Sequence, residues 1–145
     1  MTSLRNRMLV TAALALAAIC ASAVPASAQA VYAGSFTLPH EVRWQGGTLP
    51  AGDYTFRMDS KAAPAWIKLT GPNGSKFVSA IVADKDDRGG QSSLTIVRRG
   101  SKAFVHNLYL AQIGLRLKYN VPKASNGELI AEGPVTTERI LVAMK

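Results

Sequence analysis

The stretch DYTFRMD, Asp53–Asp59, decides the fold class of this chain. Tyr54, Phe56 and Met58 alternate with polar or charged neighbours, and side chains two residues apart share one face of a β-strand. A second stretch, LRLKYNV at Leu115–Val121, has the same period. We therefore expect two strands that each bury one face. The core positions that these strands predict are Tyr54, Phe56, Met58, Leu115, Leu117 and Tyr119.

Outward from these two stretches, short apolar runs predict further strands, and turn residues separate them. The expected strands are Ser35–Leu38, Glu41–Gln45, Ala65–Thr70, Phe77–Ala83, Ser93–Arg99, Ala103–Ile113 and Arg139–Ala143. The expected turns are Leu49-Pro50-Ala51-Gly52, Gly71-Pro72-Asn73-Gly74 and Arg99-Gly100-Ser101-Lys102. Gly100 stands at the first central position of the last turn, which is typical of a two-residue type II′ hairpin.

The order of these elements predicts an all-β fold. Gly or Pro interrupts the chain every few residues after Gln29, which leaves little room for a helix. Short strands joined by tight turns indicate an antiparallel β-sandwich or small barrel of about 8 strands. Because no helical segments lie between the strands, a parallel sheet is not expected.

Residues 1–28 have the three parts of a secretory signal peptide: a basic start, an apolar helical run and a site with small side chains. The site is Ala26-Ser27-Ala28, and we expect cleavage between Ala28 and Gln29, with a cut after Ala30 as the alternative. The apolar run is shorter than the roughly 20 residues that span a bilayer. The mature protein is therefore expected to have no transmembrane span and to reach the periplasm or the extracellular space.

Cleavage there leaves residues 29–145 as a single domain, 117 of the 145 residues. The one cysteine, Cys20, falls in the signal peptide and follows Ile19 rather than a small residue, so neither a disulfide nor a lipid anchor is expected. Loss of Arg5 and Arg7 lowers the 17 basic residues to 15 against 9 acidic ones, which leaves a charge of +6. A charge of this sign favours anionic surfaces as partners.

Two short motifs resemble a family of small exported bacterial proteins. Phe36-Thr37-Leu38-Pro39 fits its F-x-[VL]-P strand, and Leu49-Pro50-Ala51-Gly52-Asp53-Tyr54 fits its L-P-A-G-x-Y turn. The hairpin around Arg99-Gly100 is similar to a later hairpin of that family, and the similarity spans about Phe36 to Lys123. The family is uncharacterised, so the resemblance implies an exported β-domain and no activity.

Motifs for catalysis, for phosphate binding and for metal binding are not found in the sequence. It contains no G-x-S-x-G, G-x-G-x-x-G or G-x-x-x-x-G-K-[ST] pattern. His40 is followed by Glu41 as in a zinc protease, but Trp44 stands where the second histidine would be. We expect His40 to be a structural or surface residue. His106 alternates with Phe104 and Leu108, so we expect it to face their side as a hydrogen-bonded residue near the core edge.

The polar loop Asp84–Gln91 holds the acidic cluster of the chain. Asp84 and Asp86 stand on alternate positions, as calcium-binding loops require. Lys85 and Arg88 add positive charge, however, and no glutamate closes the loop at the required position. A solvated loop is therefore expected rather than a metal site.

Aromatic residues suggest two further hypotheses. Trp44 and Trp66 could line a ligand groove, although packing in the core or at its rim is the expected role for both. The spacing of Trp66 from Lys68 also allows it to point outward. A cavity lined by Tyr54, Phe56, Phe104 and Tyr119 would make the protein a carrier of a small apolar ligand in a barrel mouth.

The hypothesis that needs the fewest assumptions is a non-enzymatic binding or structural module without cofactor or metal. The apolar carrier and a small hydrolase are the alternatives. At the hairpin end, Arg98, Arg99 and Lys102 bring three cations together, and like charges opposite each other are mildly destabilising. Charge at an exposed hairpin tip for solubility and edge protection accounts for these residues, and contact with an anionic envelope component or polysaccharide is the alternative hypothesis for them. No nucleic acid is expected as a natural partner outside the cytoplasm.

Overall fold

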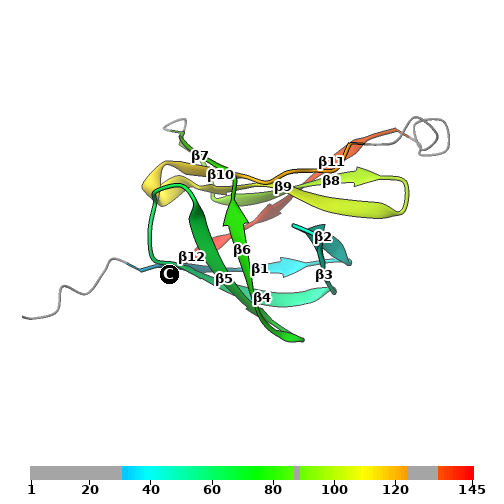
Figure 1. Cartoon of the computed structure of the whole chain (residues 1–145), viewed down its shortest axis with the longest axis horizontal. Coiled ribbons are helices and arrows are strands. Elements are labelled where there is room, and N and C mark those ends of the chain that lie inside the picture. Colours follow the sequence, from blue (N-terminus) through cyan, green and yellow to red (C-terminus); the bar gives the residue numbers. More distant parts are fainter. Residues whose placement is uncertain (1–30, 87–88, 124–133) are drawn as a thin grey trace, which may run out of the picture.

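The computed structural model describes residues 31–86, 89–123 and 134–145, and these form two β-sheets that face each other (Figure 1). The all-β prediction is confirmed. The expected signal peptide and its cleavage site, Ala28 and Gln29, lie outside the described residues. Export therefore stays a prediction from the sequence.

The first sheet has five antiparallel strands in the order β12-β1-β4-β5-β6. Their bounds are Tyr32–Leu38 for β1, Gly52–Met58 for β4, Ala65–Gly71 for β5, Gly74–Ala80 for β6 and Ala143–Met144 for β12. Burial alternates strictly along β4 and β5, because side chains on a strand point to opposite faces in turn. One face of this sheet therefore belongs to the core and the other faces away from it.

The second sheet has seven strands, with β11-β8-β9-β10-β7 in order and the β2–β3 hairpin attached to β9. The bounds are Val42–Trp44 for β2, Gly47–Leu49 for β3, Val82–Lys85 for β7, Ser93–Arg99 for β8, Lys102–Leu110 for β9, Leu115–Lys118 for β10 and Thr136–Leu141 for β11. The short 3₁₀ helix Ala111–Ile113 joins β9 to β10. A parallel bridge between Arg43 and Phe104 attaches β2, and the other pairings are antiparallel.

The expected turns form where the sequence places them. Gly71 pairs with Gly74, and Arg99 pairs with Lys102 across a two-residue turn. In that turn Gly100 has φ of 55°, as the first central position of a type II′ turn requires. At the start of β4, Gly52 has φ of 143°, and the Tyr54 hydroxyl donates a hydrogen bond of 2.9 Å to the carbonyl of Pro50.

Two strands that the sequence predicts as continuous are divided, because the chain crosses from one sheet to the other. The run Phe77–Ala83 breaks at Ile81, whose amide donates to the carbonyl of Lys118, and β7 then joins the second sheet. The run Arg139–Ala143 breaks at Val142 between β11 and β12. These two corners add two strands, and β3, which the sequence did not predict, adds another, so the described residues form twelve strands rather than about eight.

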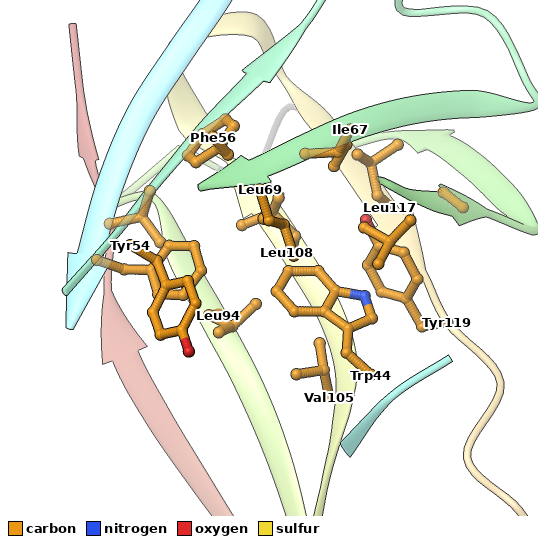
Figure 2. Packing of buried hydrophobic residues seen from close by; sticks show 14 of the residues in the cluster. Trp44, Tyr54, Phe56, Ile67, Leu69, Leu94, Val105, Leu108, Leu117 and Tyr119 are labelled. Carbon is orange, nitrogen blue, oxygen red and sulfur yellow. The ribbon is translucent and has the colours of Figure 1, made fainter. Parts of the chain in front are cut away.

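The core lies between the two sheets and contains all six positions that the alternation predicts. Trp44 is fully buried, as expected, and its ring meets that of Tyr119 edge to face, with the centroids 5.0 Å apart. Figure 2 shows the indole nitrogen on the side that faces Tyr119. Neither this nitrogen nor the Tyr119 hydroxyl has a hydrogen-bond partner among the residues that the structure describes, and burial raises the pKa of Tyr119 well above its usual range.

The prediction for His106 is wrong in part: His106 shares the outer side of the sheet with Phe104, as expected, but not the buried side of Leu108. The register of β8 and β9 shifts between Thr95 and Ile96, so that Ile96 pairs with Val105 and Thr95 pairs with Asn107. His106 is the extra residue of this β-bulge and is exposed, whereas Leu108 stays buried. A bulge reverses the alternation of faces, which a period-2 pattern does not reveal.

The free edge of the first sheet is covered by a side chain from the second. Gln45, with φ of 48°, lies in the turn between β2 and β3. Its amide nitrogen donates to the carbonyl of Ser79, and its amide oxygen accepts from the Ser79 amide at 2.8 Å. Because β6 has no strand beyond it in the described sheet, this pair satisfies groups of an open edge.

Candidate functional site

The outer face of β4, β5 and β6 carries large apolar and basic side chains together. The register places Arg57 opposite Lys68, and Lys68 opposite Phe77, in one row across three strands. Trp66 is two residues before Lys68 on β5, so it points to the same side as the row. We call Arg57, Trp66, Lys68 and Phe77 the aromatic–basic patch.

The patch is open to solvent and slightly hollowed. Trp66 is 59% exposed and Phe77 is 62% exposed. Together with Arg57, Lys68 and Asp59 they line a hollow of about 260 Å³. The prediction that Trp66 packs in the core or at its rim is therefore wrong, and the outward orientation that its spacing allows is the one observed.

The basic side chains of the patch form no ion pairs within the described part of the chain. Neither Arg57 nor Lys68 has an ion-pair partner among the described residues. The two cations face each other across neighbouring strands, an arrangement that destabilises a sheet. Asp59 offsets one of the charges, which leaves the lining of the hollow with a net charge of +1.

Protection of a sheet edge does not account for these side chains. Lysine and arginine often guard edge strands against pairing with another chain. Here Arg57 and Lys68 lie on β4 and β5, which are inner strands of the first sheet. Exposed aromatic side chains beside unpaired cations are typical of a surface that meets a partner.

The hairpin cations that the sequence singles out lie on the other sheet, at the β8–β9 turn. Arg98 is exposed. Arg99 is half-buried and donates a hydrogen bond of 2.5 Å to the carbonyl of Pro122, while Lys102 also has an interaction within the chain. The structure therefore gives two of the three cations an intramolecular role, which accounts in part for their clustering.

The two histidines are not brought together. His40 lies after β1, and its Nε2 is 2.6 Å from a carboxylate oxygen of Glu138 on β11. This contact joins segments 98 residues apart, so His40 has a structural partner, as expected. The sequence gives no signal for Glu138, because it lies 98 residues from His40 along the chain and no local pattern links the two.

The acidic loop is tied to the second sheet by basic side chains. Asp84 accepts a hydrogen bond of 2.5 Å from Lys118, and the buried Asp86 pairs with Arg116. Among the described residues no three His, Cys, Asp or Glu side chains are grouped closely enough to hold a metal ion. The expectation of a loop open to solvent is wrong for Asp86, which is only 6% exposed.

The four residues of the apolar-carrier hypothesis do not surround one cavity. Phe56 and Tyr119 pack in the core, and Phe104 is half-buried on the outer side of the second sheet. Tyr54 borders a groove of about 910 Å³ where β1 and β4 meet the corner between β11 and β12. The rings of Phe36 and Tyr54 stack there, with centroids 5.7 Å apart.

Part of the aromatic–basic patch could be found from the sequence and part could not. Alternation places Arg57 on the exposed face of Asp53–Asp59 and allows Trp66 to face outward. Phe77 begins an expected strand, but nothing in the sequence places it beside Lys68. That neighbourhood depends on the β5–β6 hairpin register.

Comparisons with known proteins give no further guide to the site. No family model, no curated protein and no solved structure matches the chain. The resemblance to small exported bacterial proteins therefore remains a prediction from two motifs. Within the described residues, no helix is long and apolar enough to cross a membrane.

Proposed function

We propose that this chain is an exported, non-enzymatic binding module that holds an anionic polysaccharide on its aromatic–basic patch. One observation carries the proposal: Trp66 and Phe77 are exposed beside Arg57 and Lys68, which have no ion-pair partners among the described residues. The signal-peptide pattern and the mature charge of +6 support an envelope or extracellular partner.

The chemistry of an acidic polysaccharide matches both components of the patch. The flat faces of Trp66 and Phe77 can stack against the apolar C–H face of a sugar ring. The guanidinium of Arg57 can hold a carboxylate through two parallel hydrogen bonds, and Lys68 adds a second positive charge. Arg57, Trp66 and Lys68 lie on the inner strands β4 and β5, and Phe77 lies on the edge strand β6. All four are presented by a paired sheet, so little ordering of the backbone is needed on binding.

Fluorescence quenching gives a direct test, because Trp44 is fully buried and Trp66 is exposed. Acrylamide, a neutral quencher, is expected to reach Trp66 and not Trp44. We expect polygalacturonate to protect Trp66 from acrylamide, and dextran, a neutral polymer, to have no effect. Rising salt should weaken the protection, because screening acts on exposed charges.

Two double variants with the same change of charge locate the site. Arg57→Gln with Lys68→Gln removes the patch cations, and Arg98→Gln with Arg99→Gln removes two cations of the hairpin. We expect the first pair to lower polygalacturonate affinity about 2–30-fold, since each exposed charge contact contributes about 0.2–1 kcal/mol and the two contributions add. The second pair should change affinity less than twofold.

The outcomes distinguish binding at the patch from binding at the hairpin, from binding by diffuse charge and from binding of a neutral ligand. Equal loss in both variants would mean that diffuse charge, not the patch, binds the polymer. Loss confined to Arg98→Gln with Arg99→Gln would assign binding to the hairpin. Protection by dextran as strong as that by polygalacturonate would refute an anionic ligand.

A further inference from the structure

The outer face of the second sheet contains a polar hollow separate from the aromatic–basic patch. Two rows of paired residues, which run across the strands, form its floor. One row contains Ser93, Tyr109 and Arg116. The other, two residues further along the strands, contains Arg139, Thr95 and Asn107. The row between them is the buried one, with Leu94, Leu108 and Leu117. The hollow has a volume of about 300 Å³ and is lined almost wholly by polar side chains.

One wall of the polar hollow is rigidly built. The ring of Tyr109 is 5% exposed, and its hydroxyl donates to the carbonyls of Asp86 and Gly89 at 3.3 and 3.1 Å. The guanidinium of Arg116 lies 5.6 Å from the centre of this ring and pairs with the buried carboxylate of Asp86. Arg116 is therefore held in place by a cation–π contact and an ion pair.

Donors remain unused around this wall. The Arg116 ion pair with Asp86 involves one terminal nitrogen, Nη2, while its Nε is buried and has no hydrogen-bond partner within residues 31–86, 89–123 and 134–145. Thr95 and Asn107 line the hollow without a side-chain hydrogen bond among the described residues. Arg139, on the other side, donates 3.2 Å to the carbonyl of Gln91 through Nη2 and keeps its other N–H groups.

The charge of the hollow selects an anion. Arg116 and Arg139 bring two positive charges, and Asp86 compensates one of them. The β-bulge between Thr95 and Ile96 lies beside the hollow and turns Asn107 toward the outer face together with His106. Bulges often occur where a sheet directs side chains toward a ligand.

We propose that the polar hollow binds a small hydroxylated carboxylate, a sugar acid, with its carboxylate between Arg116 and Arg139 and its hydroxyl groups on Thr95 and Asn107. Two guanidinium groups suit a planar carboxylate. A hydroxyl and an amide both donate and accept, as sugar hydroxyls require. The volume is at the lower end of the range for small-molecule sites, which fits a single sugar unit rather than a polymer.

Calorimetric titration of the purified protein with glucuronate tests the proposal. Acetate, which has the carboxylate alone, and glucose, which has the hydroxyls alone, are the comparison ligands. We expect saturable glucuronate binding, at least tenfold weaker acetate binding and no detectable glucose binding. A charged hydrogen bond is worth about 1.5–3 kcal/mol, so Arg139→Gln should lower glucuronate affinity about 10–100-fold.

Single variants identify which side chains bind glucuronate. Arg139 is exposed on the edge strand β11, so its replacement is not expected to unfold the protein. Thr95→Val keeps the β-branched shape and should weaken glucuronate but leave acetate unchanged. Arg57→Gln removes the same charge from the other sheet and should leave glucuronate binding unchanged.

Several results would overturn the proposal. These are no saturable binding of glucuronate, equal losses in Arg139→Gln and Arg57→Gln, or acetate that binds as tightly as glucuronate. None of these results bears on the proposal for the aromatic–basic patch, which is tested with a polymer and with the fluorescence of Trp66. The two proposals can therefore fail separately.

Discussion

The same substitution on the two faces of the first sheet should lower stability by very different amounts. Phe56 on β4 is 1% exposed and faces the second sheet, where its ring lies 6.5 Å from that of Phe36. Phe77 on β6 is 62% exposed on the other face. Phe56→Ala and Phe77→Ala remove the same atoms, so their difference measures burial.

The expected magnitudes follow from these exposures. Phe56→Ala should lower the free energy of unfolding by about 3–5 kcal/mol, through lost burial and the cavity left behind. Phe77→Ala should change it by less than about 1 kcal/mol, the span of strand propensity on an exposed face. A single domain is stable by only about 5–15 kcal/mol in total, so the first variant should come close to the limit of folding.

Urea denaturation measures both effects. Far-UV circular dichroism follows the sheets, and fluorescence of the buried Trp44 follows the core. With a slope of about 1–3 kcal/mol per M urea, the midpoint for Phe56→Ala should fall by about 1–5 M. Similar midpoints for the two variants, or a larger loss for Phe77→Ala, would refute the assignment of faces.

Three further outcomes are expected. The exported protein should have the mass of a chain that begins at Gln29; a mass that includes Met1 would contradict export through a cleaved signal. Gln45→Ala should lower the free energy of unfolding by about 0.5–1.5 kcal/mol, the net worth of a typical hydrogen bond, because the amide and carbonyl of Ser79 exchange their exposed bonds to Gln45 for water; an unchanged midpoint would show that these bonds contribute nothing to stability. Burial raises the pKa of Tyr119 from 10.0, so its ionisation favours the unfolded chain, and stability should fall as pH rises above about 10, by up to about 1.4 kcal/mol per pH unit. Tyr119→Phe should show a shallower fall above pH 10, and an identical slope in both proteins would contradict the burial of the hydroxyl.

The sequence alone determined the fold class and the buried face of the two decisive stretches. Tyr54, Phe56 and Met58 show their common face through spacing, because alternation along a strand is a local property of the backbone. The hairpin at Arg99–Lys102 is equally local, since the conformational freedom of Gly100 suits the turn. The core positions were predictable for the same reason.

Only the tertiary structure decided which strands lie side by side. Lys68 meets Arg57 and Phe77 through pairings of β5 with β4 and β6, and Arg116 meets Asp86 from a distant part of the chain. Strand register is set by packing and by bulges, which leave no period in the sequence. Both candidate binding sites consist of such neighbours. Alternation shows from the sequence that single residues such as Arg57 are exposed, but the sites could not be assembled from it.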